Sequence, residues 1–141
     1  MHWVPLEQRH LDAIALQPAQ KHVRAFMTEP GYIDTLKAGG PCMALENDDE
    51  VLVCCGLMAM WENRSVAWSL ISESAGRHFV RIFRMMRAIL EAHPVRRVEC
   101  TVDPGFDNGH RLAKLLGFEP EGLMRAYLPD GRDVVQYVRI V

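Results

Sequence analysis

The amino-acid sequence predicts a single α/β domain built on a mixed β-sheet. The chain has 141 residues, which is the usual size of one domain. Its apolar residues recur at helical spacing in some segments and alternate as in strands in others. Gly, Pro, Asn and Asp residues separate these segments, and no repeat or linker interrupts them. We therefore expect one domain over residues 1–141.

Composition and charge exclude several classes of protein. Hydrophobic residues make up 49% and charged residues 24%, which excludes a disordered tail or a collagen-like repeat. The formal net charge of −2 argues against a general nucleic-acid binder, which is usually basic. No run approaches the roughly 18 apolar residues of a membrane span, and the first residues lack the pattern of a signal peptide. We expect a cytoplasmic protein with no membrane partner.

The cysteines and histidines show no metal-binding pattern. The four cysteines lack the paired spacing of a zinc site, and the six histidines form no His-x-x-x-His pair. Cys54 and Cys55 are neighbours in an apolar run, so in a strand they would point to opposite faces. We expect buried free thiols and no metal.

The first third of the chain is expected to be helical and irregular. Apolar residues recur near helical spacing in two segments, which contain Leu6, Leu11, Ile14 and Ala15 and then Val23, Phe26 and Met27. The pattern breaks at residues 29–31 and, after a short helical turn, again at 39–41.

Strand-like and helical patterns then follow one another. Three apolar runs of strand length, separated by turns, cover residues 42–45, 51–60 and 66–71. The clearest element is a helix over residues 76–91, whose apolar stripe contains Phe79, Ile82, Phe83, Met86, Ile89 and Leu90. A strand is expected next over 95–103, with Val98, Cys100 and Val102 on one face. It is followed by a helix over 110–116, capped by Asp107 and ended by Gly117. The chain is expected to close with hairpin strands over 123–128 and 134–141.

The junction between the strand at 66–71 and the long helix has features of a phosphate site. The first turn of a helix carries unpaired N–H groups and the positive end of the helix dipole. Gly76 would let a ligand approach the backbone closely. A plain helix cap is the alternative, because most strand–turn–helix junctions with a Ser and a Gly are caps.

Four arginines lie on one side of the same helix. They are Arg77, Arg81, Arg84 and Arg87. Three interpretations stay open: a solvated basic face, a contact with a nucleic acid or an acidic protein that also uses Arg96 and Arg97, and an anionic ligand bound near the helix start. Because guanidinium groups match phosphate geometry, Arg77 and Arg81 are candidate ligand-binding residues.

The C-terminal third carries the pattern of a known family. Residues 112–122 read Leu-Ala-Lys-Leu-Leu-Gly-Phe-Glu-Pro-Glu-Gly, and a Tyr-x-Arg strand follows at 137–139. This segment resembles the closing part of the GNAT superfamily of N-acetyltransferases. The strand, glycine and helix before it occupy the place of the acetyl-CoA motif of that superfamily. The resemblance covers roughly residues 41–141, and the chain is most similar to the small acetyltransferase-like proteins of tailed phages and prophages.

The resemblance implies both the fold and the donor site. The fold would be a GNAT-like mixed sheet, mostly antiparallel and twisted, with splayed central parallel strands and helices on both faces. Acetyl-CoA, the implied co-substrate, would insert between the strands at 66–71 and 95–103. Its pantetheine arm would pair with the backbone of Leu70 and Ile71. The implied pyrophosphate-binding residues are Ser74, Ala75, Gly76 and Arg77, helped by Arg81.

The sequence also departs from the family pattern. In the phosphate loop only Gly76 fits, while Glu73 adds negative charge and His78 adds bulk. The usual tyrosine acid is replaced by Ala113, and the usual asparagine position falls two residues before Asn108, which is kept as a candidate for cofactor binding.

Acyl transfer to an amine needs a base for the ammonium proton and donors for the oxyanion. Tyr127 and His110 are the candidate acids that could replace the missing tyrosine. Asp103, at the end of the second splayed strand, is the candidate base, with a turn-forming role before Pro-Gly as the alternative. Glu99 could serve instead, or could be half of a surface pair with Arg97.

Two functions follow from these residues. The first is an acyl-CoA-dependent N-acetyltransferase that acts on an amine of a small molecule or a protein. The second is a GNAT-fold module that has lost catalysis and binds a partner, for example in a phage particle. The irregular phosphate loop and the missing tyrosine favour the second function. Nucleic-acid binding ranks below both, and a homodimer or a protein partner is compatible with either.

Overall fold

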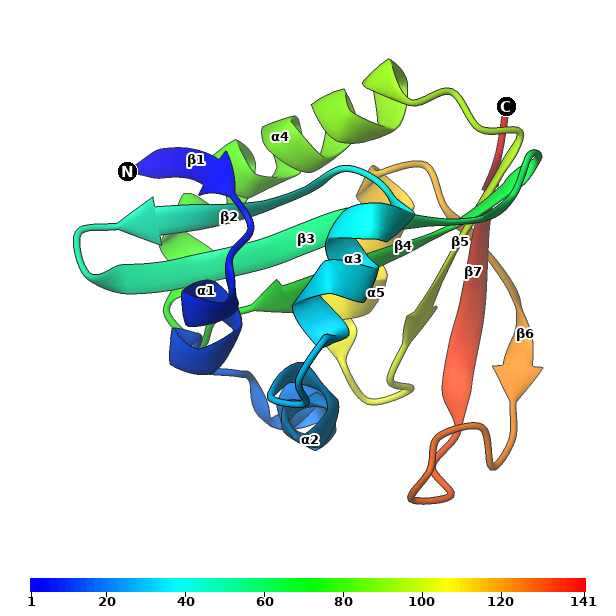
Figure 1. The fold of residues 1–141 in the computed structure, drawn as a ribbon. Coiled ribbons are helices and arrows are strands. Elements are labelled where there is room, and N and C mark those ends of the chain that lie inside the picture. Colours follow the sequence, from blue (N-terminus) through cyan, green and yellow to red (C-terminus); the bar gives the residue numbers. More distant parts are fainter.

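A seven-stranded sheet organises the structure, a computed structural model that describes residues 1–141 (Figure 1). The strands are β1 (His2–Pro5), β2 (Cys42–Asn47), β3 (Glu50–Trp61), β4 (Arg64–Ile71), β5 (Arg97–Val102), β6 (Glu119–Met124) and β7 (Val134–Ile140). The α-helices are α1 (Gln8–Ala13), α2 (Arg24–Met27), α3 (Tyr32–Gly39), α4 (Phe79–Ala92) and α5 (Asp107–Leu115), and the 3₁₀ helices are η1 (Pro18–Val23) and η2 (Ala75–His78).

The strand order across the sheet is β1-β2-β3-β4-β5-β7-β6. Every neighbouring pair is antiparallel except β4 and β5, which run parallel. The parallel pairing joins only residues 64–66 to residues 97–99, and beyond these positions the two strands diverge. The predicted fold class, a mixed sheet with splayed central parallel strands, is confirmed.

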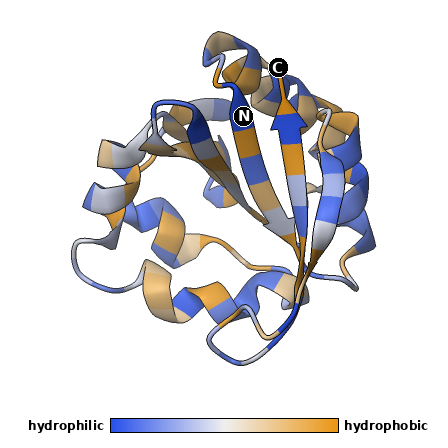
Figure 2. Ribbon diagram, turned by 90° about the vertical axis from the view of Figure 1, so that its right-hand side faces the viewer, coloured by the Kyte–Doolittle hydropathy of each residue, from blue (hydrophilic) through white to orange (hydrophobic).

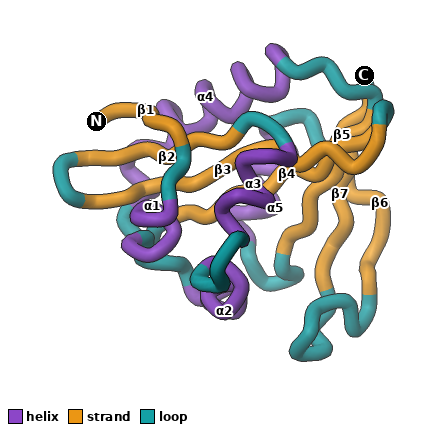
Figure 3. Tube along the Cα trace, viewed as in Figure 1, coloured by secondary structure: helices purple, strands orange, loops and turns teal.

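Helices cover both faces of this sheet (Figure 2 and Figure 3). On one face, α1, α2 and α3 pack around a core cluster that contains Cys54. On the other face, α4 and α5 pack around a cluster that contains Cys55. The two neighbouring cysteines therefore point to opposite faces, as the alternation of a strand predicts. Both are buried free thiols, and burial raises the pKa of each to about 12.

The N-terminal strand β1 was not expected from the sequence. Residues 2–5 pair antiparallel with β2, although the first third was predicted to be helical and irregular. Four residues are too few for a visible alternation, and the partner strand lies some forty positions further along the chain. The pairing thus depends on a long-range contact that local periodicity does not reveal.

The hairpin at the C-terminus also differs from its prediction. Strand β6 begins at Glu119 and ends at Met124, whereas residues 123–128 were expected. Pro120 and Gly122 resemble turn residues, but they flank a register irregularity on an edge strand, where proline is tolerated. Tyr127 consequently lies in the loop between β6 and β7, not on a strand.

The long helix α4 agrees closely with its prediction, and α5 agrees in part. The expected helix over 76–91 divides into η2 and α4, and its buried residues Ile82, Met86 and Leu90 belong to the predicted stripe. Helix α5 was expected over 110–116 with Asp107 as its cap, but it begins at Asp107 and its N-cap is Phe106; Gly117 adopts φ +91° just after the helix, as expected. None of the helices is long and apolar enough to cross a membrane.

Candidate functional site

The site is built around the divergence of β4 and β5, and its closed end is held by charges. Glu99 is the last β5 residue in the parallel pairing, and it is buried. Its carboxylate accepts hydrogen bonds from Arg64 (2.9 Å to Nη2), from Arg97 (3.0 Å to Nε) and from Gln136 (2.8 Å). These partners, Arg64 foremost, lower the pKa of Glu99 to about 2. Glu99 therefore fastens the two strands together and is too weak a base to serve in catalysis.

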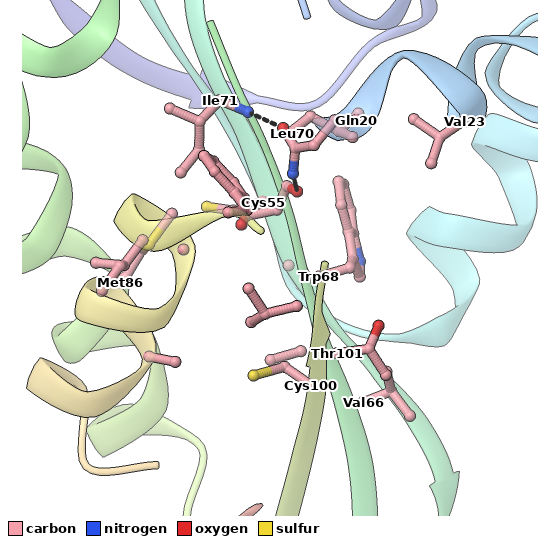
Figure 4. A pocket seen from close by; sticks show the side chains of 18 of the residues that line it. Gln20, Val23, Cys55, Val66, Trp68, Leu70, Ile71, Met86, Cys100 and Thr101 are labelled. Carbon is pink, nitrogen blue, oxygen red and sulfur yellow. Dashed lines mark hydrogen bonds between the residues drawn. The ribbon is translucent and has the colours of Figure 1, made fainter. Parts of the chain in front are cut away.

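Past this point the gap between β4 and β5 becomes a cleft with a volume of about 320 Å³ (Figure 4). Both strands line it, together with residues from the helices on both faces of the sheet. On the side of α2 and α3 its wall includes Met27, Tyr32, Leu36 and Trp68. On the side of α4 and α5 its wall includes Ile71, Met86 and Leu112. The cleft thus reaches from one face of the sheet to the other.

The side chain of Gln20 lies against the open edge of β4 at this cleft. Its Nε2 donates to the carbonyl of Ser69 (2.8 Å), and its Oε1 accepts from the N–H of Ile71 (3.0 Å), as the dashed lines in Figure 4 show. Strand backbones alternate in direction, and the N–H of Ser72 donates to Leu52 of β3 (2.8 Å). The backbone N–H and carbonyl of Leu70 therefore face β3. The backbone groups at the open edge are those of Ser69 and Ile71, whereas Leu70 and Ile71 were expected to pair with the donor arm.

Polar groups gather at the end of the cleft that α2 and α3 cover. Asp103 lines this end, and its carboxylate accepts from Arg132 Nη1 (3.3 Å) and from the N–H of Gly105 (2.9 Å). His22 also lines the cleft, and its Nδ1 is buried without a hydrogen-bond partner. Burial, followed by the charge of Arg132, lowers the pKa of His22 below its ordinary value. A neutral imidazole with a free nitrogen can accept a proton.

His22, Gln20 and Trp68 are site residues that the sequence did not indicate. His22 and Gln20 belong to η1, a short 3₁₀ helix in the irregular first third of the chain. Trp68 lies on β4, and its indole Nε1 is buried beside the cleft without a hydrogen-bond partner. No motif marks these positions, because only the folded chain brings η1 to the end of β4.

The candidate acids predicted from the sequence lie outside the cleft lining. His110 Nδ1 is 2.7 Å from the hydroxyl of Tyr137, and its Nε2 is 3.1 Å from the carbonyl of Pro104. Tyr127 is 56% exposed in the loop after β6. Asn108 is exposed in the first turn of α5. Of the three tyrosines, Tyr32 is the one that lines the cleft.

The predicted phosphate loop has an acidic surrounding. The hydroxyl of Ser74 hydrogen-bonds to the carboxylate of Glu50 and lies 3.0 Å from the hydroxyl of Ser72. Glu73 adds a second exposed carboxylate at the same turn. Ala75 is buried, whereas nothing would obstruct a Cβ at Gly76.

The arginines of α4 lie on its outer face. Arg77 and Arg81 line a shallow groove with Trp3, and Arg81 donates to the carbonyl of Met1 (2.8 Å). The residues of this groove are Trp3, Arg77, His78, Val80, Arg81, Arg84, Met85 and Ala88. None of them lines the cleft between β4 and β5. Arg77 in η2 and Arg81 in the first turn of α4 therefore lie near the start of α4, with their side chains outside the cleft lining.

Comparison with known proteins gives the class of fold. No family model and no curated protein sequence matches the chain. Ard1 from Thermoplasma volcanium is similar in structure with a TM-score of 0.76 and 15% identity, over 99% of this chain and 97% of that chain. Aminoglycoside 6'-acetyltransferase type Ii is similar with a TM-score of 0.71 and 11% identity, over 99% of this chain and 97% of that chain.

A third structure contains a ligand. It is a GNAT family acetyltransferase from Elizabethkingia anophelis with acetyl-CoA bound, which is similar with a TM-score of 0.63 and 9% identity, over 80% of this chain and 84% of that chain. The chain therefore has the fold of the GNAT acetyltransferases. At these identities the likeness concerns the fold, and the activity must be argued from the site.

Proposed function

We propose that the protein is an acyl-CoA-dependent N-acetyltransferase. The observation that carries this proposal is the cleft between β4 and β5, which crosses the sheet and ends at Asp103 and His22. A narrow passage of this kind suits an extended arm that enters from one face and meets an amine from the other. The edge of β4 that β5 has left carries the backbone groups of Ser69 and Ile71, which now pair with Gln20 and could pair instead with an amide-containing arm such as pantetheine.

In this reaction an amine nitrogen attacks the thioester carbonyl, a C–N bond forms, and the C–S bond breaks to release a thiolate. The ammonium form of the amine must first lose a proton. His22 is the better placed base, because its Nδ1 is free, whereas both carboxylate oxygens of Asp103 already accept hydrogen bonds. Asp103 remains the alternative base. Tyr127 and His110 remain predictions for the acid that protonates the thiolate, since neither lines the cleft.

The acceptor end of the cleft favours an amine on an apolar or aromatic body. Its walls are formed by Val23, Met27, Leu36 and Trp68. An apolar substrate would bury surface there, whereas a polyamine would place its additional charges against these apolar walls. The phosphates of the donor are proposed to lie near Ser74, Ala75, Gly76, Arg77 and Arg81, and Asn108 stays a predicted cofactor-binding residue.

The first test is thermal melting with and without acetyl-CoA. A ligand at a hundredfold excess over its Kd stabilises a folded protein by about 2.7 kcal/mol, which moves the melting temperature by several degrees at this chain length. A screen of aromatic and aliphatic amines for thiol release follows. The acetyltransferase proposal is wrong if acetyl-CoA at millimolar concentration leaves the melting temperature unchanged.

One set of observations favours a second candidate, a GNAT-fold module without catalysis. The phosphate end carries the carboxylates of Glu50 and Glu73, and the family's tyrosine position is occupied by the buried Ala113. Such a module would bind neither acetyl-CoA nor desulfo-CoA, and its partner would be found among proteins. A place in a phage particle stays a prediction of the sequence resemblance.

A further inference from the structure

The open edge of β4 is occupied by the chain itself. The parallel pairing with β5 stops at Val66, so the backbone groups of Ser69 and Ile71 have no strand partner. The side-chain amide of Gln20 takes one donor and one acceptor from them, at 2.8 Å and 3.0 Å. It pairs with β4 in the way that a residue of a neighbouring strand would.

The segment before Gln20 continues this pairing past the end of β4. The carbonyl of Ala15 accepts from the N–H of Glu73 (3.1 Å), and Leu16 forms an isolated antiparallel bridge with Ser72. Residues 15–20 therefore run along this open edge: Ala15 and Leu16 pair with Glu73 and Ser72 just past the end of β4, and Gln20 bonds to β4 itself. Ala19 and Gln20 are the members of this segment that line the cleft, and Gln20 is the one whose side chain bonds to β4.

An amide-containing donor arm and Gln20 need the same two backbone groups. Each backbone N–H and carbonyl in a partly buried edge is normally paired once, so a pantetheine amide can bond here only after Gln20 has left. Gln20 shares η1 with His22 and Val23, which line the acceptor end. Displacing it would thus also move the wall against which the amine binds.

We propose that Gln20 is a displaceable stand-in for the donor arm, which holds η1 against β4 until an acyl-pantetheine donor releases it. This inference rests on the proposed function and goes beyond it. It predicts ordered binding, with the donor first, because the acceptor wall reaches its working position only after Gln20 has moved. It also predicts that Gln20 opposes donor binding, whereas a residue that only shaped the fold would not.

The test compares Gln20→Met with the wild type. Methionine keeps the length and most of the volume of the side chain but cannot pair with Ser69 or Ile71. Because the ligand-free state loses two hydrogen bonds that the donor can replace, Kd for acetyl-CoA by calorimetry should fall roughly tenfold. Pantetheine, which lacks the nucleotide, should show the same gain. Gln17→Met, at a partly exposed neighbour with no side-chain hydrogen bond, should leave both affinities unchanged.

One further measurement and a second variant separate the possible outcomes. In the ligand-free protein, hydrogen exchange at the Ile71 amide should be faster in Gln20→Met than in the wild type. Gln20→Asn, whose amide is one methylene too short, serves if the methionine variant does not fold. Equal or weaker donor binding by the variants would overturn the stand-in role and leave the acetyltransferase proposal intact. If neither the wild type nor the variants bind acetyl-CoA or pantetheine, the donor site and the inference both fail.

Discussion

The two ends of the β4–β5 pair use the same strands in opposite ways. At the closed end, the backbone pairing of the two strands stops at Glu99. The buried carboxylate of Glu99 accepts hydrogen bonds from Arg64, Arg97 and Gln136. At the open end, the backbone edge is left to the single side chain of Gln20. The buried hydrogen-bonding groups of this network are satisfied within the protein, so no ligand is needed to complete it. One neutral amide at a cleft can be exchanged for another amide, which is the property that a binding site needs.

The largest effect should come from breaking the closed end. Glu99→Ala would leave Arg64 and Arg97 without the carboxylate that joins them, and removing one partner from a buried ion pair costs about 3 kcal/mol or more. Urea unfolding measures this loss. Glu121→Ala is the matched control, because Glu121 also pairs with Arg97 but is 43% exposed. Its loss should be much smaller because solvent screens the exposed pair, and equal losses in the two variants would refute the difference drawn between buried and exposed pairs.

Acid should weaken the same end. The pKa of Glu99 is about 2 in the folded protein, below its ordinary value of 4.5. A lowered folded pKa gives a contribution that is complete above pH 4.5 and disappears as the pH falls toward 2. The contribution is roughly 3 kcal/mol.

The pH effect is measured as a difference between two proteins. The free energy of unfolding of the wild type and of Glu99→Gln is followed by urea titration from neutral pH into the acid range. The gap between them should be constant near neutral pH and should narrow as Glu99 becomes protonated. A gap that stayed constant throughout would show that Glu99 has no lowered pKa.

At the open end the expected effect is on rate. His22→Gln should lower kcat about a hundredfold without changing acetyl-CoA affinity, since loss of a general base costs 10²- to 10⁴-fold. The wild-type rate should reach its plateau below the pH at which an ordinary histidine titrates, because burial lowers the pKa of His22. Asp103→Asn is the companion variant. A larger loss in Asp103→Asn than in His22→Gln would assign the base to Asp103.

The smallest effect concerns the arginines at the start of α4. If Arg77 contacts the donor phosphates, Arg77→Ala should weaken acetyl-CoA binding about threefold, as expected for an exposed ionic contact, and leave pantetheine binding unchanged. Arg84→Ala, in the same outer groove but further from η2, is the control. Unchanged affinity for both ligands would mean that the phosphates lie elsewhere.

Elements with strong periodicity were predictable, and weak or non-local ones were not. The apolar stripe of α4 and the alternation of β5 are local patterns, so their positions agree with expectation to within a few residues. β1 has only four residues, and its reason to be a strand is the distant edge of β2. The predicted position of β6 was wrong because Pro120 and Gly122 resemble turn residues, and only the structure shows that they lie on an edge strand.

The candidate site divides in the same way. Asp103 and Ile71 line the cleft, as expected for residues at the ends of the two splayed strands. Tyr127 and His110 were chosen by nearness in sequence, and the fold directs one to solvent and the other toward Tyr137. His22 was missed because its distance from Asp103 along the chain is large.

Patterns along the chain were enough to predict the mixed sheet and to reveal the closing segment that resembles the GNAT acetyltransferases. These depend on the order of residues along the chain, through periodicity, turn residues and short motifs. Three features arise only when the chain folds: the parting of β4 and β5, the bond between Glu99 and Arg64 that joins the two strands, and the positions of Gln20 and His22 at the opening. Contacts between distant segments depend on burial and on pairing of backbone groups, and no local pattern encodes them.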